Sequence, residues 1–242
     1  MSFQLVKEIF LDNWPMYLRG AGMTIVISVI STILGAIIGL LIGVVRTIPE
    51  PATRGKRVIL KVVNTIFSAY VEYFRGTPMI VQAMVIYYGS ALLFDIHLNR
   101  FVAAIIIVSI NTGAYMAEIV RGGITSIDEG QFEAASAIGM THFQSMFNII
   151  LPQVIRNILP ATANEFVINI KDTSVLNVIG VTELFFQTKS ITGNNFKFFE
   201  SYFIASGIYL LMTFTITRIL RHFEKRLDGP QNYDLVGNQM QV

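Results

Sequence analysis

The chain has 242 residues, of which 53% are hydrophobic and only 14% are charged. Its mean hydropathy is +0.57, whereas an ordinary soluble domain carries about a quarter charged residues. This composition excludes an intrinsically disordered chain, and the lack of any cysteine excludes disulfides, thiol nucleophiles and cysteine-based zinc sites. The net charge of +2 is too small to indicate nucleic-acid binding. The composition therefore indicates an integral membrane protein that lies in a lipid bilayer.

Three long uncharged runs predict membrane-spanning helices. A bilayer core of about 30 Å needs roughly 20 apolar residues in a helix. Runs without a charge cover residues 21–45, 101–117 and 201–217. The first is too long for the apolar part of a signal peptide, which has about 7–15 residues. We therefore expect it to remain in the protein as a transmembrane helix.

Two further regions, residues 58–94 and 155–186, are apolar but interrupted by charges. Basic segments stay on the cytoplasmic side of a membrane, and both the loop 46–57 and the tail after residue 217 are basic. Both can be cytoplasmic only if an even number of spans lies between them. This favours one long span over residues 58–94, broken near Gly76-Thr77-Pro78, and a further span over residues 155–186.

These assignments predict an all-α integral membrane protein that forms a single transmembrane domain of five helices. Its N-terminus is expected outside and its C-terminus inside. The predicted spans are about 20–46, 58–94, 100–121, 155–186 and 200–221, and the predicted cytoplasmic loop is about 122–154.

The cytoplasmic loop has a helix–glycine–helix pattern. Residues 131–138 favour a helix, and Gly139 interrupts it because glycine lowers helix propensity by about 1 kcal/mol relative to alanine. Phe143, Phe147 and Ile150 follow at helical spacing, which predicts a short amphipathic helix. Such a unit would present an apolar surface suited to a groove on another protein.

This loop resembles the EAA loop of the permeases of ABC importers. That signature is Glu-Ala-Ala, three residues, Gly, nine residues, Ile, one residue and Leu-Pro. The matching residues here are Glu133, Ala134, Ala135, Gly139, Ile149, Leu151 and Pro152.

Three other segments narrow the resemblance to polar amino-acid permeases of the glutamine, glutamate and histidine type, with the type I importer fold. They are EYFRGTP at 72–78, NTGAYMAEIVRGGI at 111–124 and NEFVINIKDTS at 164–174. The resemblance covers about residues 13–226. Asp128-Glu129 departs from the pattern, since the family often has Pro followed by a basic or polar residue there.

The resemblance implies a transmembrane pore subunit of an ATP-driven amino-acid uptake system in a prokaryotic cytoplasmic (inner) membrane. Two permease chains, alike or different, would form the path, and an extracytoplasmic binding protein would deliver a polar amino acid such as glutamine or glutamate. Two cytoplasmic ABC ATPases would dock on the EAA loops. The implied coupling residues are Glu133, Ala134, Ala135, Gly139, Phe143 and Phe147.

The chain itself is not expected to be an enzyme or to hold a cofactor. It has no G-x-x-x-x-G-K-[ST] phosphate loop, so ATP and Mg²⁺ would be bound by the separate ATPase. No pair among its three histidines has metal-ligand spacing, and the sequence shows no nucleophile–base arrangement. A membrane-embedded enzyme is therefore not expected.

Charged residues in the fourth predicted span are candidates for substrate contact. Each charge at a bilayer centre costs about 2.5–3.5 kcal/mol, and an apolar residue returns only about 0.3–0.6 kcal/mol. The segment with Glu165, Lys171 and Asp172 must therefore face protein or water. At about 100° per residue, Glu165, Asn169 and Asp172 share one stripe, and Lys171 lies about 100° to the side.

A free amino acid is a zwitterion, so its site needs groups of both signs. The candidate substrate-binding residues are Glu165, Lys171, Asp172 and Asn169. A structural alternative stays open, in which Lys171 and Asp172 pair between helices or one of them lies at a helix end.

Other polar residues have structural explanations. Asn111, Tyr115 and Glu118 recur on one face of the third predicted span, where bracing between helices is favoured over ligand contact. Thr77 and Gln82 lie beside the predicted break, and a helix-bend role is favoured for them over a pore-lining one.

A second function stays open from intramembrane charges alone, namely an ion-coupled secondary amino-acid transporter or channel. Five spans without an internal repeat, together with the EAA loop, weigh against it. Uptake driven by an ion gradient without ATP would identify this alternative.

Overall fold

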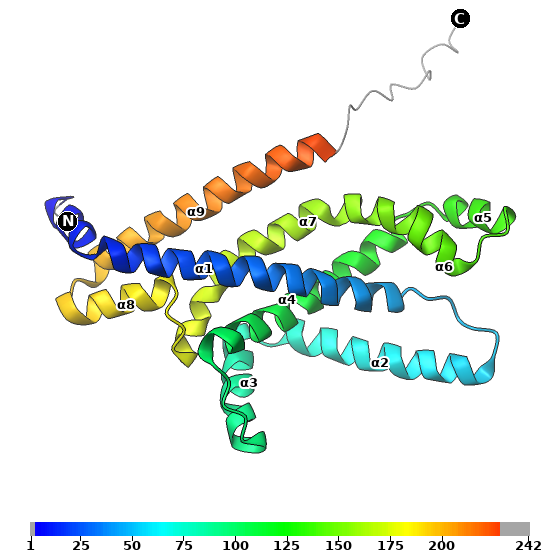
Figure 1. The fold of residues 1–242 in the computed structure, drawn as a ribbon, viewed down its shortest axis with the longest axis horizontal. Helices are drawn as coiled ribbons and strands as arrows, with labels where there is room; N and C mark the ends of the chain where they lie inside the picture. The colour runs from blue at the N-terminus through cyan, green and yellow to red at the C-terminus, as the bar shows by residue number, and fades with distance from the viewer. Residues whose placement is uncertain (1–2, 228–242) are drawn as a thin grey trace, which may run out of the picture.

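The computed structural model describes residues 3–227, and within them every regular element is helical. Figure 1 shows the long helices lying along the long axis of the molecule, with α3 projecting sideways and α5 and α6 at one end. The elements are α1 (Phe3–Val45), α2 (Arg54–Gly76), α3 (Met79–Phe94), α4 (Arg100–Thr125), α5 (Glu129–Ala137), α6 (His142–Ser145), the π-helical segment η1 (Met146–Ile150), α7 (Leu151–Asp172), the 3-10 segment η2 (Thr173–Ile179), α8 (Leu184–Asn195) and α9 (Phe198–Leu227).

Helices α1 and α4 pack closely along a stripe of small residues. Gly35, Gly39 and Gly43 are buried at four-residue spacing on α1, and this spacing lets two membrane helices approach each other. A Cβ added at Gly39 would lie 2.3 Å from the Cβ of Met116 on α4, and one at Gly43 would lie 2.6 Å from Val120. The glycines therefore place α4 in the interior of the bundle.

Helix α1 begins at Phe3, well before the start predicted near residue 20. In its early part, Ile9 and Tyr17 join an apolar cluster with Leu184 of α8 and Ile204 of α9. These partners lie more than 160 residues away in the chain, so the reason for the helical extension is tertiary packing. The predicted span of about 20–46 lies within this longer helix.

The break predicted near Gly76-Thr77-Pro78 is present, and α2 and α3 are bent by 113° there. The Gln82 side chain donates to the carbonyl oxygens of Phe74 and Thr77, both at 2.9 Å. The Asn111 amide of α4 donates to Gln82 Oε1 at 2.9 Å. These bonds pair carbonyls that the bend leaves without helical partners, so the helix-bend role predicted for Thr77 and Gln82 is confirmed.

The region predicted as one span over residues 155–186 is divided in the structure. After α7 and η2, Gly180 adopts a φ of +78° and turns the chain. The carboxylate of Glu183 then accepts from the backbone N–H groups of Phe185 and Phe186 at 2.8 and 2.7 Å and begins α8. The preferred capping residues are Ser, Thr, Asp and Asn, so a glutamate in an apolar run gave no sign of a helix start. Helix α8 then continues to Asn195, past the end of the predicted span.

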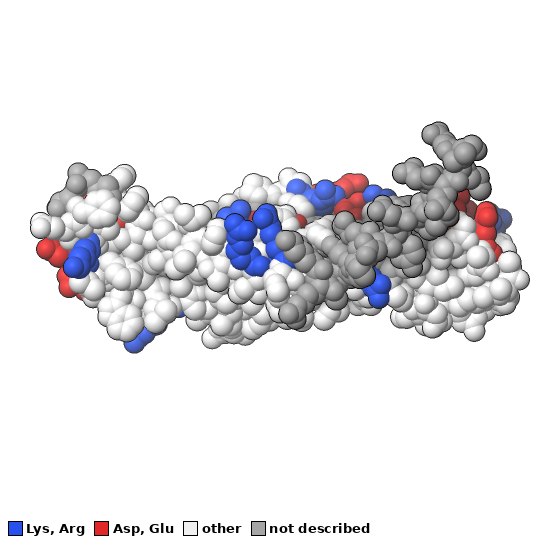
Figure 2. All heavy atoms as spheres, turned by 90° about the horizontal axis from the view of Figure 1, so that it is seen from above, with Lys and Arg blue, Asp and Glu red and all other residues white. Residues whose placement is uncertain are grey.

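Three of the described helices, α1, α4 and α9, are long and apolar enough to cross a membrane, and the bent pair α2–α3 would make four if it counts as one span. Helix α7 is not apolar enough to be counted with them, because it carries several charged and amide side chains. Figure 2 shows a face where uncharged atoms predominate and charged atoms gather in a few separate groups. These features are those of a multi-pass helical membrane protein.

Candidate functional site

The predicted helix–glycine–helix unit of the loop is present as α5, Gly139 and α6. Asp128 begins α5 by accepting from the N–H of Gly130 at 2.7 Å. Gly139 has a φ of +81°, a backbone conformation that favours glycine. Thr141 and Gln144 then form a capping box that begins the next helix. The sequence thus folds locally into a sharp corner between two helices.

Three apolar side chains project from this corner. Ile138, Phe143 and Phe147 are 76%, 68% and 53% exposed, and the two phenyl rings lie 4.4 Å apart between centroids. Sequence reasoning missed Ile138, although an aliphatic residue directly before the corner glycine was a usable sign. We call Ile138, Phe143 and Phe147 the apolar knob.

The remaining loop residues divide between surface and interior. Glu133 and Ala134 are exposed, whereas Ala135 is buried at 1% exposure. Ile150, which the spacing placed with Phe143 and Phe147, is instead fully buried. The intervening π-helical segment adds a residue to the helical turn and shifts Ile150 off that face, so this part of the prediction was wrong.

The loop is firmly attached to the membrane helices. Met146, Ile150 and Val154 pack with Val120 and Ile124 of α4 in one buried apolar cluster. Helix α6, the π-helical segment and α7 follow one another without a break from residue 142 to residue 172. Pro152, which lacks a backbone N–H, comes directly after the π-helical segment. Phe143 and Phe147 of the apolar knob therefore share one continuous helical segment with α7.

Helix α7 carries all four candidate substrate residues, but the structure does not bring them into one cluster. Glu165 and Asn169 are buried, whereas Lys171 and Asp172 are exposed at the end of the helix. Within the part of the chain that the structure describes, no ion pair joins the three charged residues. The structural alternative that one of them lies at a helix end holds for Asp172.

Asn169 has a bracing position. Its amide nitrogen donates to Thr32 Oγ1 of α1 at 2.8 Å and to Thr112 Oγ1 of α4 at 3.0 Å. The side chain thus links α7, α1 and α4 in the interior of the bundle. Its substrate contact stays a prediction that competes with this structural role.

The polar stripe of α4 braces the bundle, as predicted. Glu118 pairs with Arg46 at the end of α1 and with Arg121 one turn along α4. The guanidinium of Arg75 lies 5.5 Å from the ring centroid of Tyr115. Together with the Asn111–Gln82 bond, these contacts tie α1, α2 and α3 to α4.

With this geometry established, comparison with known proteins identifies the family. A family model described as binding-protein-dependent transport system inner membrane component matches residues 52–229. The chain belongs to this family. It is therefore a multi-pass inner-membrane permease subunit of a binding-protein-dependent ABC importer, and ATP hydrolysis takes place on a separate subunit.

Individual relatives cover nearly the whole permease. The glutamine transport system permease protein GlnP of Escherichia coli (strain K12) is 38% identical over 214 residues, which are 88% of this chain and 93% of the relative. The L-cystine transport system permease protein TcyB of Bacillus subtilis (strain 168) is 35% identical over 229 residues, 94% of this chain and 92% of the relative.

Solved structures confirm the fold. A chain from the crystal structure of an amino acid ABC transporter with histidines matches with a TM-score of 0.77 and 35% identity, covering 90% of this permease and 96% of that chain. A chain of the inward-facing MetNI methionine ABC transporter matches at 19% identity with a TM-score of 0.72, covering 88% and 96%, and supports the type I permease fold alone.

Proposed function

We propose that this permease forms half of the translocation path of an ATP-driven amino-acid importer. A second permease chain, identical or different, would supply the other half. Two cytoplasmic ABC ATPases would dock on the α5–α6 corners, and an extracytoplasmic binding protein would deliver a polar amino acid such as glutamine or glutamate. The names of GlnP, TcyB and the amino acid ABC transporter support this substrate class.

The observation that carries the coupling role is the continuous path from the apolar knob to α7. Closure of the ATPases on ATP would move the knob, and α7 would move with it because Phe143 and Phe147 of the knob lie in the uninterrupted helical segment that continues into α7. Alternating access then follows if the inward-facing and outward-facing arrangements prefer different ATPase states.

The proposed topology has five spans, with α1, the bent pair α2–α3, α4, α7 and α9 crossing the membrane. Helix α7 would cross despite its polar residues because it is lined by protein and by the aqueous path rather than by lipid. The N-terminus would lie outside and the C-terminus inside, which puts the basic start of α2 and the apolar knob in the cytoplasm, as basic segments favour.

Substrate contact is proposed for α7, through Glu165, Lys171, Asp172 and Asn169. Carboxylates on this helix suit the ammonium group of an amino acid, and Lys171 suits its carboxylate. Glu165 is buried in the continuous helical segment that also carries Phe143 and Phe147 of the apolar knob, which supports a link between substrate and ATPase.

The test uses the complete importer in proteoliposomes, with ATP hydrolysis and amino-acid uptake measured in parallel. Phe143→Ala should abolish uptake and the stimulation of ATP hydrolysis by the binding protein, because it removes half of the aromatic pair in the knob. Phe203→Ala, at a phenylalanine of α9 that is also about half exposed, is the control and should leave both activities near the parent values.

A normal ratio of uptake to hydrolysis in Phe143→Ala would contradict the docking role. If the parent importer accumulated amino acid without ATP, under an ion gradient alone, the ATP-driven proposal itself would fail. That result would establish ion-coupled transport instead.

A further inference from the structure

Three cavities follow α9; two lie between α7 and α9, and the third reaches η2 and α8. The central cavity, of about 300 Å³, is lined by Lys171, Arg218 and Arg221 among others. It shares Arg221 and Thr217 with a cavity of about 240 Å³ that extends to Asn164. It shares Lys171 with a cavity of about 370 Å³ that extends to Tyr202 and Ser206. Because neighbouring cavities share wall residues, they form one groove along α7 and α9, which we call the α7–α9 groove.

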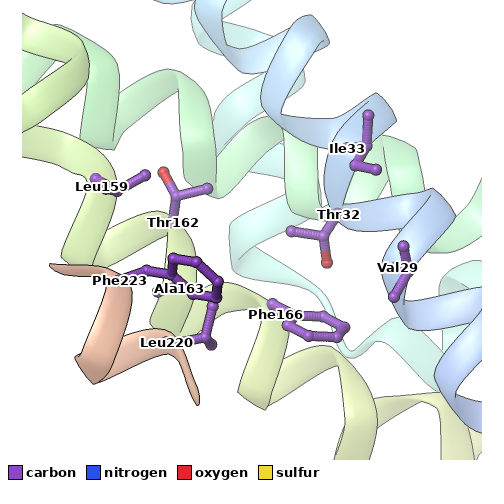
Figure 3. A pocket seen from close by; sticks show the side chains of 9 residues that line it. All are labelled: Val29, Thr32, Ile33, Leu159, Thr162, Ala163, Phe166, Leu220 and Phe223. Atoms are coloured by element: carbon purple, nitrogen blue, oxygen red, sulfur yellow. The ribbon is translucent and has the colours of Figure 1, made fainter. Parts of the chain in front are cut away.

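Arg221 lies level with the middle of the uncharged run of α1, and Arg218 lies about one turn earlier on α9. Figure 3 shows Leu220 and Phe223 of α9 lining one pocket together with Val29 and Ile33 of α1. Ile33 is the middle residue of the uncharged run 21–45, about 18 Å from either end at 1.5 Å per residue. Arg221 lies between Leu220 and Phe223 in the chain and therefore at the same depth.

Among residues 3–223, whose side chains the structure describes, no acidic group pairs with Arg218 or Arg221. The four ion pairs found there involve neither arginine nor Lys171, and no acidic side chain lines any of the three cavities. Arg218 instead lies with its guanidinium carbon 5.0 Å from the ring centroid of Phe214. Charges at this depth need water or a ligand, and the groove is the space they face.

The groove differs from the neighbouring pocket in the character of its wall. The pocket in Figure 3 is almost wholly apolar. The groove instead carries hydroxyl and amide groups along its whole length, from Tyr202 and Ser206 past Thr213 and Thr217 to Asn164. A lipid headgroup would need polar groups at one end only, whereas a solute that moves through the membrane needs them throughout.

We propose that the α7–α9 groove is this chain's wall of the translocation path, and that Lys171, Arg218 and Arg221 receive the carboxylate of the transported amino acid in succession. The inference rests on the proposed function and makes it specific. Because the wall is cationic throughout, amino acids with an acidic or neutral side chain pass, and those with a cationic side chain are disfavoured. Arg218 and Arg221 are thereby specificity-determining residues.

The first experiment measures water in the groove and does not depend on any substrate. The chain has no cysteine, so single-cysteine variants in the complete importer report one position each. Thr217→Cys, in the groove, should react with water-soluble methanethiosulfonate reagents. Ile219→Cys, two residues along α9 on a half-exposed side chain outside the cavities, should stay unreactive.

The charge of the reagent tests the cationic wall. At Thr217→Cys, an anionic sulfonate reagent should react at least several-fold faster than a cationic trimethylammonium reagent. Adding Arg221→Gln should reduce that ratio. Equal reactivity at positions 217 and 219, or equal rates for the two reagents, would overturn the proposal.

The second experiment measures uptake of glutamate, glutamine and lysine by the reconstituted importer. A hydrogen bond to a charged group contributes about 1.5–3 kcal/mol, so Arg221→Gln should lower glutamate uptake about tenfold or more. The loss should be larger for glutamate than for glutamine, and Arg221→Lys should restore most of it. Arg54→Gln, at an exposed arginine that begins α2, is the control and should change none of the three.

The two experiments separate the possible failures. A parent importer that takes up no amino acid would refute the proposed function, while the cysteine result would still decide whether the groove holds water. Normal parent uptake with unchanged selectivity in Arg221→Gln would refute the groove proposal alone. A loss that depended on anionic lipid and was equal for all three amino acids would also refute it, and would assign the arginines to lipid phosphate.

Discussion

The glycine stripe of α1 allows a quantitative prediction about helix packing. In Gly39→Ala, the added Cβ would lie 2.3 Å from Met116 Cβ, 2.7 Å from the Met116 carbonyl carbon and 2.8 Å from the Ala117 nitrogen. Non-bonded carbon atoms prefer about 3.5–4.0 Å, and two of these three neighbours are backbone atoms that cannot rotate away. The two helices must therefore separate by roughly 1 Å along their shared face.

The expected size of the effect follows from two opposing terms. Overpacking costs about 1–3 kcal/mol, and a clash with backbone belongs at the upper end. Alanine in place of glycine gains about 1 kcal/mol of helix propensity. Gly22→Ala gains the same propensity on the same helix with no atom within 4 Å of the new Cβ. The difference between the two variants thus isolates the packing term, at about 3 kcal/mol.

Both variants can be heated in mild detergent, with the folded fraction followed by size-exclusion chromatography. For a chain of 150–250 residues, 1 kcal/mol corresponds to about 2–4 °C in Tm, so Gly39→Ala should melt roughly 6–12 °C below Gly22→Ala. Equal midpoints, or a more stable Gly39→Ala, would refute the claim that close approach of α1 and α4 is required.

Two further predictions concern polar contacts inside the bundle. Gln82→Leu leaves the carbonyl oxygen of Thr77 at the α2–α3 bend without its partner, which should destabilise the protein by about 1–3 kcal/mol; an unchanged melting midpoint would show that the bend does not need the amide. Glu118→Gln removes the charge that Arg46 faces and should lower stability by about 1–3 kcal/mol, measured in the same assay. The matched control is Glu50→Gln, which removes an exposed ion pair with Arg57 at an N–O distance of 3.6 Å and should lower stability by only about 0–1 kcal/mol. An equal loss of stability in the two variants would show that the Glu118 pair contributes no more than an exposed one.

Much of the local structure could be predicted from the sequence because the responsible residues are close together in the chain. The corner at Gly139 needs a residue that tolerates positive φ, and the break at Thr77-Pro78 needs a lost backbone donor. In both cases the residue that meets the requirement can be recognised in a short stretch of sequence. The bracing role of the α4 stripe was also predictable, because Asn111 and Glu118 lie two turns apart on one face.

Other features could not be predicted because their causes are distant in the chain. Helix α1 extends to Phe3 only because α8 and α9 cover it. Asn169 was expected to face substrate, but Thr32 and Thr112 arrive from two other helices and bind its amide. The buried cap at Glu183 looks like an isolated charge until the turn after Gly180 places the N–H groups of α8 around it.

The sequence by itself determined that this is a membrane permease with a loop of the EAA type, because hydropathy and the EAA spacing are properties of consecutive residues. The tertiary structure decided the level of Arg221 along α1, the course of the groove and the continuity from Phe143 and Phe147 to α7. Level and continuity depend on how antiparallel helices align, and that alignment is set by packing between residues far apart in the chain.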